Sequence, residues 1–135
     1  MTKTHKTLSS IRKELWNTYR QVGRVLRTLQ NLNEMTPGSL YLHRRCCGKA
    51  TCRCTRGQLH SSWVVTRSEG GKIRLYTVDD RERAQVRAWT GQYRIYQRGR
   101  ARLAKLTTTL LAGVDEVVEV QRQVWPKVQS KEDVP

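Results

Sequence analysis

Four cysteines lie within a nine-residue segment, Cys46–Cys54, and the 135-residue chain contains no other cysteine. A histidine, His60, follows this segment. Clustered thiols with a nearby imidazole are the ligands that a tetrahedral zinc ion prefers. The preferred ligand set is Cys47, Cys52, Cys54 and His60, with the spacing C-x4-C-x-C-x5-H. Four protein ligands close the coordination sphere to water, so the sequence predicts a structural zinc ion that holds a loop too short for its own core.

Two further residues are candidate ligands in this segment. Cys46 is the spare thiol, because the side chains of adjacent cysteines diverge; it replaces Cys47 in one alternative, and His43 replaces His60 in another. The thiols have two other interpretations, as buried reduced groups or as disulfides. Burial conflicts with the arginine, lysine and threonine residues around them. Disulfides need an oxidising compartment, so metal binding is the favoured interpretation.

The chain is strongly basic, with 26 Lys and Arg against 11 Asp and Glu and a formal net charge of +15. Residues 44–105 carry sixteen basic and four acidic side chains, whereas residues 106–135 carry three and five. This distribution predicts that the middle of the chain binds a polyanion. The candidate nucleic-acid contacts are the basic residues in and after the cysteine segment: Arg44, Arg45, Lys49, Arg53, Arg56, Arg67, Lys72 and Arg74. The alternative is a solvated basic surface that only maintains solubility.

Membrane and export signals do not occur in the sequence. No apolar run approaches the ~20 residues needed to cross a bilayer. The polar, basic residues 1–6 are not followed by the apolar stretch of a secretory signal. These features predict a soluble cytoplasmic protein with no membrane partner.

The secondary-structure signals predict an α+β chain that is mostly helical. A single domain is expected over residues 9–126, between a flexible basic tail at 1–8 and a second flexible tail at 127–135. Within it we expect a helix over 9–34, a zinc loop and β-hairpin over 39–78, and a long helix over 79–125. The helices are expected to form an antiparallel coiled coil, with a small three-stranded sheet and the zinc loop at one end.

Residue periodicity supports each of these elements. Strands are expected over 39–44, 62–67 and 72–78, with Gly70 and Gly71 forming the hairpin turn. Apolar residues with heptad spacing in the first helix are Leu15, Tyr19, Val22, Leu26 and Leu29. Twelve positions from 86 to 124 alternate in steps of three and four, and nine are apolar: Val86, Trp89, Tyr93, Tyr96, Leu103, Leu110, Val114, Val117 and Val124. Asp79 and Glu82 form a capping-box pattern for the long helix.

The long helix is expected to outrun its partner and to leave an apolar end at residues 106–125. Soluble monomers seldom expose a large apolar patch. We therefore expect a homodimer, or a partner helix, to cover this segment. The alternative is a helix break at Gly113 that lets the segment fold back on its own chain.

The segment from Pro37 through Cys47-Gly48-Lys49, Cys52-Arg53-Cys54, Arg56-Gly57 and His60 resembles a small bacterial family with a C-G-K-x-x-C-x-C core. In that family glycine and histidine follow the core, and an aromatic strand and a long helix come next. Its members tend to occur among mobile-element and phage-like genes. The resemblance covers residues 36–100, and it implies zinc binding and a nucleic-acid setting with DNA favoured over RNA. The chain departs from the pattern in Cys46, which is extra, and in Ser61-Ser62-Trp63, where the family has glycine, proline and tyrosine.

Together these features predict a zinc-stabilised accessory protein that binds nucleic acid, DNA before RNA, and self-associates through its long helix. Trp63 and Tyr76 are candidates for base stacking, and equally for sheet core. The alternative function is a coiled-coil adaptor subunit of a recombinase, transposase or phage assembly without its own nucleic-acid contact. An enzyme is not expected, because no paired carboxylates, phosphate-binding glycine motif or Ser–His–Asp set occurs, and nothing supplies a base to Cys46.

Overall fold

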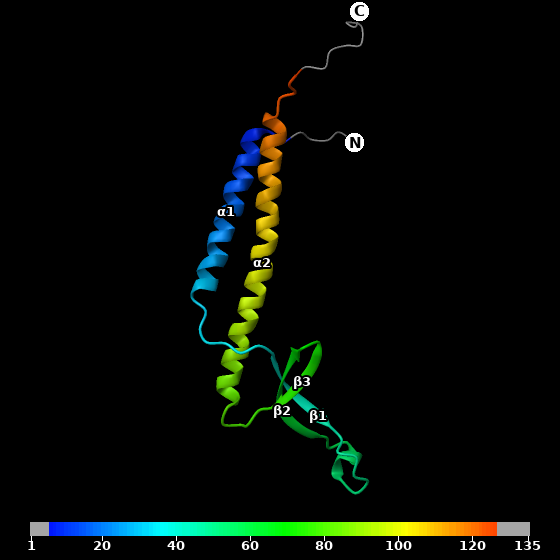
Figure 1. Ribbon diagram of the computed structural model, residues 1–135. Helices are drawn as coiled ribbons and strands as arrows, with labels where there is room; N and C mark the ends of the chain where they lie inside the picture. The colour runs from blue at the N-terminus through cyan, green and yellow to red at the C-terminus, as the bar shows by residue number, and fades with distance from the viewer. Residues whose placement is uncertain (1–5, 127–135) are drawn as a thin grey trace, which may run out of the picture. The chain divides into compact units, whose positions relative to one another are not determined.

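The computed structural model describes residues 6–126, which form two long helices, three strands and a short 3-10 helix (Figure 1). The elements are α1 (Leu8–Gln30), β1 (Ser39–Arg45), η1 (Arg53–Arg56), β2 (His60–Glu69), β3 (Lys72–Thr77) and α2 (Arg83–Gln121). The predicted α+β class is confirmed. The tail predicted at 127–135 and the first five residues of the tail predicted at 1–8 lie outside the described residues.

The chain divides into two compact units. One combines the residues up to Arg27 with those from Ala101 onward, and the other is Thr28–Arg100. The helix α2 contributes to both units, and so does α1. No helix in the described part of the chain is long and apolar enough to span a membrane.

The sheet belongs to the second unit and has the strand order β1-β2-β3, with both pairs antiparallel. Gly70 and Gly71 adopt φ values of 55° and 80° between β2 and β3, the left-handed conformation that the hairpin turn requires. The central strand β2 supplies the buried residues Val64 and Val65. The strands therefore lie where the sequence predicted them, and β2 extends further than expected in both directions.

The strand register sorts the side chains onto two faces. Tyr41 is opposite Val64, His43 is opposite Ser62, and Arg45 is opposite His60. Because paired residues of antiparallel strands point to the same side, these six side chains share one face. The other face carries the pairs Leu42–Trp63 and Val65–Tyr76. The first face leads directly to His60, a predicted metal ligand.

In the first unit, α1 and α2 run antiparallel and pack through small and apolar residues. Ile11 and Leu106 are buried, as is Thr18, whose hydroxyl donates to the Glu14 carbonyl at 3.0 Å. A Cβ atom on Gly113 would lie 2.5 Å from Leu15 Cδ2, so the glycine lets the leucine approach the α2 backbone. The predicted seam is therefore wrong in part: Tyr19 and Leu26 of α1 and Val114 of α2 are exposed.

In the second unit, the chain leaves α1 earlier than predicted and continues beside α2. The helix ends at Gln30, not at residue 34. The Asn33 amide donates to Gln92 Oε1 at 3.0 Å and the Thr36 amide donates to the Trp89 carbonyl at 3.2 Å. These amides are satisfied by α2, so they are not available for a further turn of α1.

The end of α1 meets α2 well beyond the first residues of that helix. A Cβ on Gly99 would lie 2.7 Å from Leu29 Cδ2. The segment that follows α1 contacts the earlier part of α2, through the hydrogen bonds of Asn33 with Gln92 and of Thr36 with Trp89.

The ends of α2 also differ from the prediction. The helix begins at Arg83, after a turn in which the Arg81 amide donates to Asp79 Oδ1 at 3.5 Å. It then continues without a break through Gly113 to Gln121. The alternative in which the chain folds back at Gly113 is therefore excluded. Leu106 is buried within the first unit, so the segment 106–125 is covered in part by its own chain, while Leu111, Val114 and Val118 remain exposed.

Candidate metal centre

The loop between β1 and β2 brings the cysteines together through a series of tight turns. The Cys52 amide donates to the Lys49 carbonyl at 3.1 Å, and the Thr55 hydroxyl donates to the Cys52 carbonyl at 2.7 Å. Gly48 has a φ of 81°, and Gly57 ends η1 with a φ of 95°. Glycine takes such values without a steric penalty. The chain thus reverses within a few residues and turns the thiols inward.

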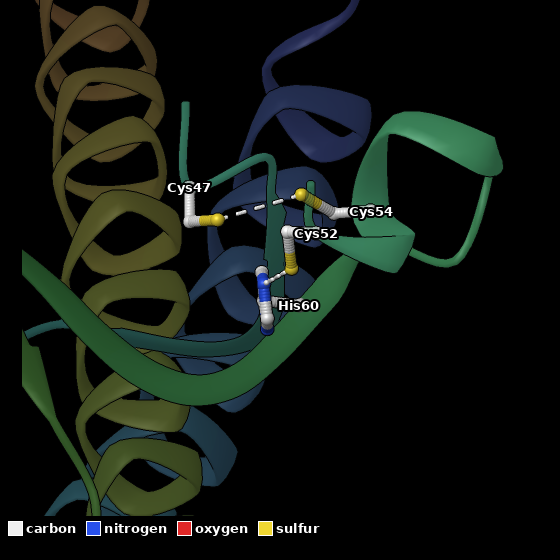
Figure 2. A group of neighbouring side chains, drawn as sticks. All are labelled: Cys47, Cys52, Cys54 and His60. Carbon is white, nitrogen blue, oxygen red and sulfur yellow. Dashed lines mark hydrogen bonds between the residues drawn. The ribbon is translucent and has the colours of Figure 1, made fainter. Parts of the chain in front are cut away.

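Four side chains of this loop and of β2 converge on one point (Figure 2). The donor atoms of Cys47, Cys52, Cys54 and His60 all lie within 4.8 Å of one another. The Cys47 and Cys54 sulfurs are 3.5 Å apart, and Cys52 Sγ is 3.1 Å from His60 Nε2. Ligands of a tetrahedral zinc ion, with Zn–S near 2.3 Å, are separated by about 3.5–3.8 Å. The cluster can therefore hold a metal ion after small side-chain adjustments.

The exposure of the four residues is graded. Cys54 is 3% exposed, Cys52 is half-buried, and Cys47 and His60 are exposed. All four cysteines of the chain are free thiols. Even the shortest sulfur–sulfur distance, 3.1 Å between Cys46 and Cys54, is far longer than the ~2.05 Å of a disulfide. One end of the cluster is thus fixed in the loop and the other is open to an arriving ion.

Neither alternative ligand belongs to this group of four. Cys46 contacts Cys54 but is not among the residues whose donor atoms converge. The ring of His43 packs edge-on against Tyr41, with ring centroids 6.3 Å apart. The imidazole of the cluster is therefore that of His60.

The environment acts in opposite directions on two of the thiols. A hydrogen bond from the Lys49 amide, followed by one from Cys54, lowers the pKa of Cys47 to about 6. A hydrogen bond with Cys46 is the main cause that raises the pKa of Cys54 to about 12. Of these two thiols, Cys47 is therefore the one that ionises more readily. A thiolate is the form that binds a metal.

Five basic side chains surround the cluster, and all are exposed: Arg44, Arg45, Lys49, Arg53 and Arg56. The sequence contains no Asp or Glu between Glu34 and Glu69. Within residues 6–126, none of the five forms an ion pair. Their charge is therefore not neutralised by this part of the protein.

The basic residues predicted on the hairpin are in a different situation. Arg67 and Arg74 both lie beside Glu69, with nitrogen–oxygen distances of 3.3 and 3.4 Å. The Arg67 Nε is buried, and its contact with Glu69 is an ion pair without an aligned hydrogen bond. Lys72 is exposed and lies opposite Glu69 in the strand register. The structure thus shows five basic residues without an ion pair in the loop, and two basic residues with one on the sheet.

Both candidate stacking residues are engaged by other side chains. Trp63 lies under the guanidinium groups of Arg83 and Arg87, which are 5.3 and 5.2 Å from its ring. Tyr76 lies under Arg67 at 4.7 Å, and its hydroxyl donates to Glu69 Oε1 at 2.7 Å. Sequence reasoning predicted none of these contacts of Glu69. Its position as the single acidic residue between Glu34 and Asp79, among several arginines, was the signal that could have indicated them.

Comparison with known proteins places the chain in a family. No curated protein and no solved structure shows significant similarity to it. The family described as "Domain of unknown function (DUF6788)" matches residues 10–88, which include most of α1, the sheet, the cysteine loop and the start of α2. The match takes in more than half of the 135 residues, so the chain belongs to this family of domains of unknown function.

Proposed function

We propose that the chain is a zinc-stabilised accessory protein that binds DNA through its cysteine loop. One observation carries the proposal: three thiols and an imidazole converge in a loop whose five basic side chains have no acidic partner among residues 6–126. The set of Cys47, Cys52, Cys54 and His60 suits zinc in both ligand type and number.

In this proposal the metal has a structural role and the basic residues make the contacts. The loop has one buried residue, Cys54, and so has little apolar core to hold it. A bound ion fixes the loop by linking Cys47, Cys52 and Cys54 to His60 at the start of β2. The side chains of Arg53 and Arg56 in η1 then lie at fixed positions, where they neutralise phosphates and release counterions.

The choice of DNA rests on the resemblance described for residues 36–100, whose family setting is among mobile-element and phage-like genes. A role beside a mobile element is part of the proposal for the same reason. The free thiols support a reducing compartment, the cytoplasm, as the site of action.

Elemental analysis of the purified protein tests the metal. We expect about one zinc ion per chain, and Cys52→Ser should lower this content strongly because it removes a ligand. An alanine in place of the exposed Thr51 next to it is the matched control and should retain the metal. A folded wild-type protein without bound metal would contradict the proposal.

A salt titration of DNA binding tests the contacts. Each phosphate contact contributes about 0.9 to the slope of log K against log salt. We therefore expect the double variant Arg53→Gln, Arg56→Gln to reduce this slope by about 2. The variant Lys13→Gln, Arg20→Gln removes the same charge from exposed positions of α1 and should leave the slope nearly unchanged. Equal losses in both variants would mean that only net charge matters.

A second candidate function, a coiled-coil adaptor, is favoured by the exposed apolar residues of the first unit. Trp16 and Tyr19 are each 61% exposed on α1 and lie edge-to-face at 5.6 Å. Leu111, Val114 and Val118 are exposed on α2. Such surface is typical of an interface, and here the proposed occupant is a second copy of the chain.

Light scattering of wild-type protein and of Trp16→Lys, Tyr19→Lys tests this candidate. We expect a dimeric mass for the wild type and a monomeric mass for the variant. A dimer that binds no DNA at low salt would favour the adaptor over the DNA-binding protein, whereas a wild-type monomer would remove self-association from either.

A further inference from the structure

One face of the sheet carries an exposed aromatic residue on the strand that leads into the cysteine loop. Tyr41 is 38% exposed on β1, with the half-buried His43 ring edge-on to it at 89°. Arg45 is the next residue of β1 on this face and is also exposed. Aromatic and basic side chains alternate in this way on surfaces that bind unpaired bases and their phosphates.

The opposite face is less suited to this role. Its aromatic residues, Trp63 and Tyr76, already lie under arginine side chains. It also carries Glu69, whose carboxylate already pairs with Arg67 and Arg74 of this face. The face of Tyr41 has no acidic residue on any of the three strands, and on β3 it exposes Leu75 and Ile73. On the face of Tyr41, aromatic surface, apolar surface and positive charge therefore occur together without an acidic residue on the strands.

This face is continuous with the loop that carries the basic residues. Arg45 lies opposite His60, a residue of the metal cluster, at the end of the sheet. Arg53 and Arg56 follow in η1, within the same loop. At about 3.3 Å per residue, Tyr41 and Arg45 are roughly 13 Å apart along the strand. A nucleic-acid strand is thus able to place a base on Tyr41 and neighbouring phosphates on Arg45 and the loop.

We propose that the face formed by Tyr41, His43 and Arg45 binds single-stranded DNA, with a base stacked on Tyr41. The inference rests on the proposed function and deepens it by naming the form of DNA. Stacking on a side chain needs a base whose face is free, and a duplex buries its base faces between neighbouring pairs. The basic loop alone would bind duplex and single strand alike, because phosphate contacts carry no such preference.

Fluorescence anisotropy with a labelled oligothymidylate, the same strand annealed to its complement, and an oligouridylate of equal length tests the proposal. We expect the full-length, metal-loaded protein to prefer the oligothymidylate to the duplex. Tyr41→Ala should weaken single-strand binding by about 5- to 150-fold, the range for loss of one stacked base, and leave duplex binding unchanged. Tyr41→Phe keeps the ring and should bind as the wild type does.

Ile95→Ala is the control, because it removes an exposed apolar side chain from α2, and it should not change binding. Ultraviolet crosslinking of thymidine to the wild-type protein should label the tryptic peptide 28–44, which contains Tyr41, and this readout does not depend on how any variant folds.

Three outcomes overturn the inference: equal loss of duplex and single-strand binding in Tyr41→Ala, tighter binding of oligouridylate, or crosslinks outside the sheet face. If the Arg53→Gln, Arg56→Gln variant still loses DNA binding in those cases, the proposed function stands without the inference. If no nucleic acid binds to the wild type, both fail.

Discussion

At the scale of single residues, Cys54 is the centre of the candidate metal site. It is buried, and its sulfur is 3.5 Å from Cys47 and 3.1 Å from Cys46. The exposed Cys46 contacts Cys54 but is not one of the four residues whose donor atoms converge. Because of this difference in position, Cys54 is a candidate ligand and Cys46 is not, although their side chains are chemically identical.

Serine variants of the two cysteines should therefore behave differently. Cys54→Ser removes a central ligand, and we expect metal content to fall from about one ion per chain to nearly none. Cys46→Ser should retain the metal, because the four donors of the cluster remain. Absorption of the cobalt-substituted protein measures both, since thiolate ligands give a characteristic charge-transfer band. Equal loss in the two variants would make Cys46 a ligand.

The carboxylate of Glu69 contacts three side chains of the hairpin. It accepts a hydrogen bond from the Tyr76 hydroxyl at 2.7 Å and pairs with Arg67 and Arg74. The hydrogen bond to Glu69, and then burial, raises the pKa of Tyr76 above its ordinary value. The neutral phenol is thus favoured by the folded state.

This gives a prediction in the alkaline range. A tyrosine pKa raised on folding adds stability that is present below the ordinary tyrosine pKa, about 10, and is lost as pH rises through the folded value. An absorbance titration of the phenols should show one tyrosine that ionises late. Glu69→Gln should shift this late step to lower pH, and Tyr76→Phe should remove it. A late step that persists in Tyr76→Phe would belong to another tyrosine.

At the scale of elements, two glycines determine how α1 and α2 meet. Gly113 receives Leu15 in the first unit and Gly99 receives Leu29 in the second. Fourteen residues, two heptads, separate the glycines in the sequence, and fourteen separate the leucines. The glycines therefore do not merely weaken α2: they occupy positions where a leucine of α1 lies against its backbone.

Alanine substitutions distinguish these glycines from others in the helices. Gly91 and Gly23 have no atom within 4 Å of an added Cβ, so Gly91→Ala and Gly23→Ala should stabilise the protein by up to ~1 kcal/mol through helix propensity. At Gly99 and Gly113 the new methyl group overlaps a leucine, at a cost of about 1–3 kcal/mol that offsets this gain. Urea denaturation measures the difference. Equal stabilisation at all four positions would contradict the close contact of Gly99 and Gly113 with the leucines of α1.

The same glycines explain where sequence reasoning succeeded and where it failed. Cysteine spacing predicted the cluster residues, and turn residues predicted the hairpin, because both signals are local. The long helix was also evident, but its seam was placed on Arg100, Thr107 and Val114. Heptad scoring rewards apolar residues and treats glycine as an interruption, whereas the seam uses Gly99, Leu106 and Gly113. Such a choice depends on the partner helix, which a single segment does not show.

The faces of the sheet were equally beyond local reasoning. Trp63 and Tyr76 have the composition of stacking residues, and Tyr41 has the same composition. Only the strand register and the arginines of α2 determine that Trp63 is covered while Tyr41 is exposed. Candidate residues for base stacking were therefore predictable as a type but not as positions.

At the scale of the whole molecule, the candidate metal site draws none of its donor atoms from the helices of the described residues. All four donors lie between residues 47 and 60, in one loop and the first residue of β2. Most hydrogen-bonded backbone is in α1 and α2, which do not contribute a donor to the cluster. The ion should therefore order a local segment rather than the fold.

Metal removal tests this separation. A chelator that strips the protein should leave the far-ultraviolet circular dichroism of the helices nearly unchanged, because α1 and α2 pack through Leu15, Leu29 and the seam glycines without the loop. Hydrogen exchange of residues 46–60 should increase, since few backbone hydrogen bonds hold the loop. The Cys54→Ser protein should match the stripped wild type in both measurements. Collapse of the helical signal on chelation would instead mean that the ion holds the whole chain together, as in small domains whose folding depends on zinc.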